Sequence, residues 1–512
     1  MASAEEKRSE VASAANSGSS SRDVTLGASS MTYLGQGRLD SGIRSSMQES
    51  SWAGSLRNTL GPDHSSREKS GGGYHLSNWE ASIGLGTTSY LGQGTLQRDS
   101  TYSTFGLEVL TANQTPLLDL KGQLQLMVSA NHSHYNFVEI PEAYVGLSPQ
   151  FSPVQLGVGR RLENWSQLDE TWGLGIWQPR FRWDYIDPQP VGLAGAFLTV
   201  QQPNLRIVLM GSPFFVPDRG APADFAEGRI QSQSPWLVNL PYTVNLFNQP
   251  TPIRYTAEIP NTMDVVTHKI VLSGLVRAGS EKGPWGSVAY AYKPMNQFIT
   301  SYEAYHNNGT SEVEATIYPH FEYHSLSSVQ GGFNSARTES SLSLLTDSPD
   351  LRAQDPRLTT QELRTSLAVS PSFAVRLRGE GREATTADIS YLKQWGGDAP
   401  DSGRLASGAS SFESRYPFKN AGRLGLKSSL SPLFGKSAGN FYGSVKTLVD
   451  LKNPGNILST QLAYRPRQSW SLMMGADLIT SFSELPENPS SPDFISRYRA
   501  NDRVYGGLNY AF

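Results

Sequence analysis

The feature that most constrains this chain is a set of segments in which apolar and polar residues alternate over ten or more positions. In residues 118–129, leucine, valine or glycine stands at every even position, and mainly polar residues stand at the odd ones, among them Asp119, Lys121 and Gln123. A strand of an ordinary sheet is about 5–6 residues long, whereas about 9–11 tilted residues are needed to cross a bilayer. The length of this run therefore favours a strand that crosses a membrane.

The same alternation recurs along the chain, with turn residues between the runs. Residues 373–382 alternate between an apolar set and a set rich in arginine, and residues 470–478 alternate from Trp470 onward. Weaker alternation covers residues 101–112, 190–200, 204–212, 268–278, 285–293, 312–325, 338–346, 420–432, 440–452 and 455–466. Sequences with proline or glycine, such as Gln201–Asn204 and Lys452–Asn456, separate these runs. Hairpin after hairpin without a helical period predicts an antiparallel meander.

A meander that crosses a membrane must close on itself, because every backbone polar group in lipid needs a partner within the protein. We therefore expect residues 75–512 to form an all-β fold, a single large antiparallel transmembrane β-barrel with inward-folded loops. The runs correspond to about 16–20 strands, and single-chain bacterial barrels keep an even number, so 18 is our best estimate. A barrel of 16 or more strands leaves room for an aqueous channel.

The composition agrees with this fold. Charged residues make up 17% of the chain, against about 25% in soluble domains, yet the mean hydropathy is −0.38. Low charge without high hydropathy fits strands that face lipid on one side and water on the other. The absence of cysteine excludes disulfides and thiolate sites. A net charge of −3 provides no electrostatic footprint for nucleic acid.

Residues 1–74 differ from the rest of the chain. They are rich in serine and glycine and cannot bury enough apolar surface, so we expect a largely disordered tail. The first residues show neither the basic region nor the apolar core of a signal peptide. Thr32–Leu39 nearly repeats as Ser89–Leu96, which indicates either a local duplication or a tail segment that docks as a strand or plug.

The C-terminal residues carry a family resemblance. Val504–Phe512 ends in an aromatic residue and resembles the terminal strand of bacterial outer-membrane β-barrel proteins, porins among them. Within it, Gly506 departs from the pattern, because a larger apolar residue is commoner there. Four residues fall at the spacing of the signal that the barrel assembly machinery reads in that family: Tyr505, Gly507, Tyr510 and Phe512. The resemblance implies an integral protein of the bacterial outer membrane, with membrane lipid and the assembly machinery as partners and the tail in the periplasm.

Two irregular segments interrupt the meander, and the first is residues 160–184. Leu162, Trp165, Leu168 and Trp172 recur at helical spacing, which predicts a short amphipathic helix. The segment resembles the porin loop that folds inward and sets acidic groups against a basic wall, and this implies Asp169 and Glu170 as the acidic side. The basic candidates are Arg160, Arg161, Arg180, Arg182, Arg376, Arg378 and Arg382. The alternative is that these charges form salt bridges at the rim or in loops.

The second irregular segment, residues 213–260, holds eight prolines and several aromatic residues. A loop near 50 residues should be functional or disordered, and this one is too aromatic for a solvated linker. We expect it to fold over or into the pore, or else to form an outer cap that shields the mouth or contacts other subunits. Aromatic residues near the expected strand ends fit the girdles found at membrane interfaces: Trp285, Tyr290, Tyr292, Trp395, Tyr464 and Trp470.

Enzymatic function finds little support in the sequence. His320 and His324 share a strand face about 13 Å apart, too far to chelate one metal. No serine lies in a G-x-S-x-G elbow, and no convincing His–Asp pair is visible. We therefore expect no catalytic residues, metal or cofactor.

The function that we predict is passive diffusion of small hydrophilic solutes through a water-filled pore, constricted near residues 160–184 and 213–260. The alternative is a plugged structural or complex-forming barrel that acts in surface assembly, secretion or adhesion. Possible protein partners are copies of the same chain or other envelope proteins, and nucleic acid is not expected.

Overall fold

The computed structural model describes residues 79–92 and 101–512, apart from residues 116, 149–150, 221–222, 233, 238–239, 241, 247, 268, 281, 351–354, 356, 380–383, 399–413, 431–439, 468 and 483–492. The predicted tail, residues 1–74, and the near-repeat of Thr32–Leu39 therefore lie outside the described residues, and so does Arg382. No helix in the described part is long and apolar enough to cross a membrane.

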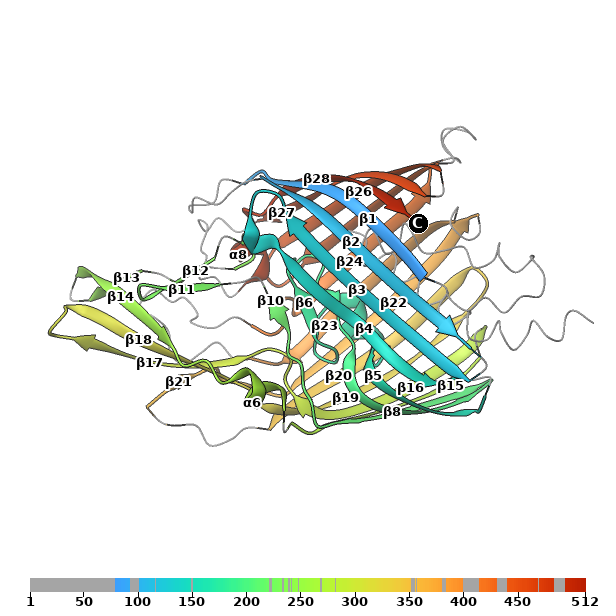
Figure 1. Ribbon diagram of the computed structural model, residues 1–512, viewed down its shortest axis with the longest axis horizontal. Helices are drawn as coiled ribbons and strands as arrows, with labels where there is room; N and C mark the ends of the chain where they lie inside the picture. The colour runs from blue at the N-terminus through green and yellow to red at the C-terminus, as the bar shows by residue number, and fades with distance from the viewer. Residues whose placement is uncertain are drawn as a thin grey trace, which may run out of the picture. The chain divides into compact units, whose positions relative to one another are not determined.

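Eighteen antiparallel strands form one closed barrel (Figure 1). The strands are β1 (Trp79–Tyr90), β2 (Thr101–Gln114), β3 (Leu118–Ser129), β4 (Phe137–Leu147), β5 (Val154–Arg161), β8 (Leu193–Gln202), β9 (Leu205–Ser212), β15 (Val271–Gly279), β16 (Gly283–Pro294), β19 (Tyr323–Asn334), β20 (Thr338–Asp350), β22 (Ser366–Arg378), β23 (Thr385–Gly396), β24 (Asn420–Ser429), β25 (Phe441–Asp450), β26 (Gly455–Arg467), β27 (Trp470–Ser481) and β28 (Arg503–Ala511). Each pairs with the next in this order, and β28 pairs with β1. The prediction of an all-β barrel with 18 strands is confirmed.

The alternation seen in the sequence separates the outside of the barrel from its inside. In β3, Leu124 and Val128 are 37% and 40% exposed, whereas Gln123 and Gln125 are 3% and 4% exposed. The same holds for β5, where Leu156 and Val158 are exposed and Gln155 is buried. An apolar exterior and a polar interior suit a strand with lipid on one side and a polar lumen on the other.

Connections between strands differ at the two ends of the barrel. At one end, turns such as 203–204, 280–282 and 335–337 are short, and we call it the short-turn end. At the other, the long-loop end, loops such as 162–192 and 213–270 hold most of the remaining chain. In barrels of the bacterial outer membrane, short turns face the periplasm and long loops face the cell exterior.

Long loops also build a second sheet of five strands (Figure 1). Its strands are, in spatial order, β13 (Thr243–Leu246), β14 (Gln249–Ala257), β18 (Glu312–His320), β17 (Ile299–Asn307) and β21 (Thr359–Thr360). The expectation of one strand over residues 312–325 is therefore wrong. β18 ends at His320 in this sheet, and β19 starts at Tyr323 in the barrel. The sequence did not separate the two strands, because a half-buried strand shows the same alternation in either sheet.

The C-terminal strand closes the barrel. Leu508 of β28 pairs with Leu85 of β1, and the Phe512 amide donates to the carbonyl oxygen of Ala81 at 2.9 Å. Tyr510 packs against the outward-facing Trp470 and against Phe512, so these rings lie on the outer face. Tyr505 and Gly507 stand at the alternate positions, which face the lumen. Recognition of the four residues by an assembly machinery stays a prediction.

Candidate pore constriction

Residues 162–192, here called the inner loop, connect β5 to β8 and cross the lumen. Trp172 Nε1 donates to Ser370 Oγ of β22 at 3.0 Å, and the Gln167 amide donates to Gln330 Oε1 of β19 at 2.7 Å. Arg423 of β24 donates to the Thr171 carbonyl oxygen at 3.0 Å. In the ring of 18 strands, β24 stands nine places from β5 in either direction. The inner loop therefore reaches the wall opposite its origin.

A short helix, α5 (Gln167–Trp172), forms the part of the inner loop that meets the opposite wall. Ser166 Oγ accepts from the Asp169 amide at 3.4 Å and caps its start, and Gly173, with φ of 60°, ends it. Trp165 lies before the helix and stacks on Trp177 with ring centroids 5.9 Å apart. The predicted helix is confirmed for its second half, which carries Leu168 and Trp172.

The two acidic residues of α5 find their partners within the inner loop. The buried Asp169 carboxylate accepts from the amides of Ile176 at 3.0 Å and Trp177 at 3.2 Å. Burial raises the pKa of Asp169 to about 6. Glu170 forms an ion pair with Arg180 at 3.2 Å. Both carboxylates thus organise the fold of the loop, and the described contacts do not set them against a basic wall.

Glu163 anchors the start of the inner loop. Its carboxylate pairs with Arg206 of β9 at 2.6 Å and with Arg161 of β5 at 3.2 Å. Burial alone raises the pKa of Glu163, but the two guanidinium groups outweigh it and lower that pKa to about 2. Because Arg206 lies near the turn at 203–204, this ion pair shows that the chain after β5 folds back deep into the barrel.

A pH titration tests this anchor. A carboxyl whose folded pKa is depressed stabilises the fold fully above its unfolded pKa of about 4.5, and that contribution is lost as the pH falls toward 2. In the variant Glu163→Gln, we expect a loss of about 3–5 kcal/mol at neutral pH and a flatter pH dependence between 4.5 and 2. Thermal unfolding followed by tryptophan fluorescence in detergent measures both. The control is Glu362→Gln, which removes the exposed partner of Arg364. If the stability of all three proteins depended on pH in the same way, Glu163 would not anchor the inner loop.

The predicted basic residues divide among several places. Arg161 is buried, with its guanidinium 5.0 Å from the centroid of the Tyr144 ring. Arg160 pairs in register with Ala143 and Ala194, and its guanidinium forms an ion pair at 3.0 Å with Glu139, which is buried.

Arg180 and Arg182 belong to the inner loop, in β6 (Arg180–Arg182), and Arg182 pairs with Asp218 at 2.7 Å. Arg376 and Arg378 are exposed at the short-turn end of β22, apart from the inner loop. The structure therefore brings Asp169, Glu170, Arg180 and Arg182 together within the inner loop. It pairs Arg160 and Arg161 with other carboxylates, Glu139 and Glu163, and leaves Arg376 and Arg378 elsewhere.

The second irregular segment divides between two locations. Its first part lies against the barrel strands, where Trp236 Nε1 donates to the Tyr90 hydroxyl at 3.1 Å and the Trp236 carbonyl accepts from Tyr498 at 3.2 Å. Trp236 is buried there. Its second part forms β13 and β14 of the five-stranded sheet. Residues 213–260 thus contribute both to the interior packing and to the structure outside the barrel wall.

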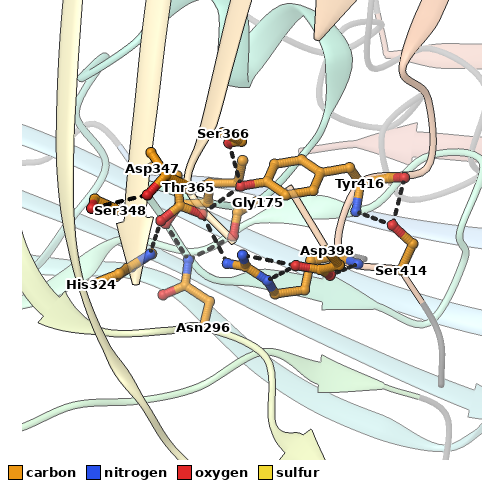
Figure 2. Close-up of polar contacts among 12 residues, drawn as sticks. Gly175, Asn296, His324, Asp347, Ser348, Thr365, Ser366, Asp398, Ser414 and Tyr416 are labelled. Atoms are coloured by element: carbon orange, nitrogen blue, oxygen red, sulfur yellow. Dashed lines mark hydrogen bonds and ion pairs between the residues drawn. The ribbon is translucent and has the colours of Figure 1, made fainter. Parts of the chain in front are cut away.

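A buried polar cluster was not foreseen, and it contains a His–Asp pair that the sequence did not reveal. His324 Nδ1 lies 2.8 Å from Asp347 Oδ1, and Arg415 bridges Asp347 at 2.8 Å and Asp398 at 3.0 Å. Figure 2 shows His324, Asp347, Asp398 and Tyr416 gathered at this place. Tyr416 also donates to Asp347. We call these five residues the wall cluster. It ties the segment that begins at Ser414 to β19 and β20, and its buried side chains offer no access to a substrate.

Asn296, which follows the barrel strand β16, connects the barrel wall to the inner loop. Its Nδ2 donates to the carbonyl oxygens of Gly175 at 2.7 Å (Figure 2) and Ile176 at 3.1 Å. Lys293 Nζ donates to Asn296 Oδ1 at 2.6 Å. The segment that follows β16 is thus hydrogen-bonded to the inner loop, although the two are about 120 residues apart. In the described part of the chain, no group of three or more His, Asp or Glu residues could hold a metal ion.

A closed barrel of 18 strands with an apolar exterior, a polar interior and a loop across the lumen is the fold of a porin-like β-barrel. No protein-family model matches the chain, and no curated protein matches it in sequence.

Solved structures similar to the chain include Pseudomonas aeruginosa OccK11 (OpdR), at 13% identity over 85% of this chain and 96% of that one, with a TM-score of 0.44. Acinetobacter baumannii OccAB4 is 9% identical over 85% and 98%, with a TM-score of 0.46. The outer membrane protein opdK from Pseudomonas aeruginosa is 12% identical over 85% and 99%, with a TM-score of 0.42.

Proposed function

We propose that this protein is a porin that allows passive diffusion of small hydrophilic solutes across the outer membrane. The observation that supports this most is the inner loop, which spans the lumen from β5 to β24. A barrel of 18 strands without such a loop would leave a wide aqueous channel, so a crossing loop narrows the bore. Segments near residues 160–184 and 213–260 would then set the size limit.

Charge would add selectivity to this size limit. Pore selectivity arises from rings of charged side chains together with the bore, and Glu163, Arg161 and Arg206 stand where the inner loop leaves the wall. Arg376 and Arg378 would act separately, at the short-turn mouth of the barrel. Because β1 begins at that end, the preceding tail would lie in the periplasm.

The alternative is a plugged barrel with a structural role in surface assembly, secretion or adhesion. The dense packing of the lumen favours it: Trp165, Trp177 and Trp236 are all almost completely buried. In that case the inner loop would close the pore instead of narrowing it.

Conductance measurements separate the two proposals. For a porin, we expect stable ohmic current steps of nanosiemens scale from the purified protein in a planar bilayer, and swelling of proteoliposomes in small sugars but not in large polysaccharides. A plugged barrel predicts a silent protein in both assays. A protein that stays silent until residues 1–74 are removed would favour a plug formed by the tail.

A further inference from the structure

Three lysines line a pocket at the long-loop end of the barrel. Lys393 of β23, Lys419 before β24 and Lys452 after β25 surround a cavity of about 420 Å³, together with Trp395 and Asn420. The strands β23, β24 and β25 are neighbours in the barrel. Residues distant in sequence are therefore brought to one place by the strand order.

Lys393 and Trp395 line the pocket from the outer face of the barrel, and the buried Gln394 lines it from the other face. In β23, Tyr391, Lys393 and Trp395 share one face, while Ser390, Leu392 and Gln394 on the other face are buried. Lys393 pairs in register with Asn420, whose Oδ1 accepts from the Tyr391 hydroxyl at 2.7 Å. Lys393 thus stands on a face where the other side chains are apolar or aromatic.

The pocket lies at the level expected for lipid headgroups. Trp395 is the last residue but one of β23, and it is 51% exposed. Leu451, whose amide donates to the Asn420 carbonyl oxygen at 2.8 Å, is 54% exposed. Exposed tryptophan and tyrosine mark the membrane interface, and lysine side chains extend from apolar surface toward polar headgroups. The loop between β25 and β26, residues 451–454, is short, so little of it can cover the site.

Among the residues that the structure describes, no carboxylate forms an ion pair with any of the three lysines, and Asp398 is the one described carboxylate whose charge favours the charged form of Lys419. Lys419 Nζ donates to the carbonyl oxygens of Gly396 at 3.4 Å and Asp398 at 3.3 Å. The Asp398 side chain is occupied by Arg415. Burial and the nearby Lys452 lower the pKa of Lys419. A cluster of cations that repel one another is suited to an anion from outside the chain.

We propose that this pocket binds the phosphate groups of an anionic lipid in the outer leaflet of the membrane. Lysine ammonium groups bind phosphate as point charges, and basic pockets on the wall of a membrane protein bind anionic headgroups. A lipid suits the site better than a dissolved anion, because Trp395 and Leu451 provide apolar contact for acyl chains beside the charges. The proposal does not depend on whether the lumen conducts.

The test compares two double variants of equal charge. Lys393→Gln/Lys452→Gln removes two lysines of the pocket and keeps Lys419, which contacts backbone carbonyls. Lys269→Gln/Lys282→Gln removes two lysines elsewhere on the surface and serves as the control. Native mass spectrometry in a neutral detergent counts the molecules of bis-phosphorylated lipid A, or of its phosphate-free form, that remain bound. Gel mobility before and after heating checks that each variant is folded.

The wild type should retain the phosphorylated lipid at least about tenfold better than the phosphate-free form, since each lysine contributes to binding. The pocket variant should lose this preference, and the control variant should keep it. Equal retention by the pocket variant and the wild type would overturn the proposal. Displacement of the lipid by millimolar inorganic phosphate would overturn it as well, because the site would then bind free phosphate.

Discussion

Replacing residues 167–178 of the inner loop with a short Gly–Ser linker should raise the single-channel conductance at least about fivefold. This replacement removes α5 and its contacts with β19, β22 and β24, which are the contacts that carry the loop across the lumen. The barrel wall closes independently of the loop, through pairing of β28 with β1. The measurement is the step size in a planar bilayer, and the size of sugar that permeates proteoliposomes should increase with it.

A milder variant and a matched control accompany the replacement. Trp172→Ala removes the hydrogen bond to Ser370 while the loop stays in place, so we expect fluctuating current with a smaller rise in mean conductance. Shortening the hairpin between β17 and β18, residues 305–314, alters a loop outside the barrel wall and should leave the step size unchanged. An unchanged step size in the loop replacement would show that the inner loop does not limit the bore.

The barrel could be predicted from the sequence because the period-two signal is local. In β3 the polar residues predicted to share a face are the buried ones, and the leucines opposite them are exposed. The spacing of Leu168 and Trp172 likewise gave a helix where α5 lies. The same signal failed at residues 312–325, because β18 alternates in the five-stranded sheet just as a barrel strand would. Alternation indicates that one face of a strand is buried, but it does not indicate whether the other face meets lipid or water.

The ion pairs of the lumen could not be predicted, because they join residues distant in sequence. Glu163 and Arg206 are 43 residues apart, and Asp347 and Arg415 are 68 apart. Alternation can show that a side chain faces inward, but not which inward residue it meets.

The basic pocket was missed, although one signal was present. Lys393 interrupts an otherwise apolar face between Tyr391 and Trp395. A charge on the lipid face of a barrel strand is unfavourable near the membrane midplane and tolerated near the interface. Such a residue indicates either a strand end or a partner at the headgroup level. Lys419 and Lys452 join it through the register of neighbouring strands, which the period-two alternation does not specify.

Removing the central charge of the wall cluster should destabilise the barrel strongly. Asp347 is completely buried and binds His324, Arg415 and Tyr416 at once. In Asp347→Asn the side chain keeps its size, but Arg415 loses one of its two carboxylate partners inside the protein. Breaking a buried ion pair from one side costs about 3–5 kcal/mol. We expect the midpoint of denaturant unfolding to fall accordingly, and current through the pore to become noisier as the segment at Ser414 loosens.

The matched control is Asp355→Asn, which removes an aspartate that also pairs with an arginine, Arg357, but in an exposed position. Exposed ion pairs are screened by water and salt, so this variant should unfold like the wild type. A second comparison uses His324→Asn, which should lower stability less than Asp347→Asn because it leaves the contact between Arg415 and Asp347 intact. Equal stability of Asp347→Asn and Asp355→Asn would mean that the wall cluster does not hold the loops to the barrel. If the Asp347→Asn protein were less stable but its current stayed as quiet as that of the wild type, the wall cluster would stabilise the barrel without influencing the pore.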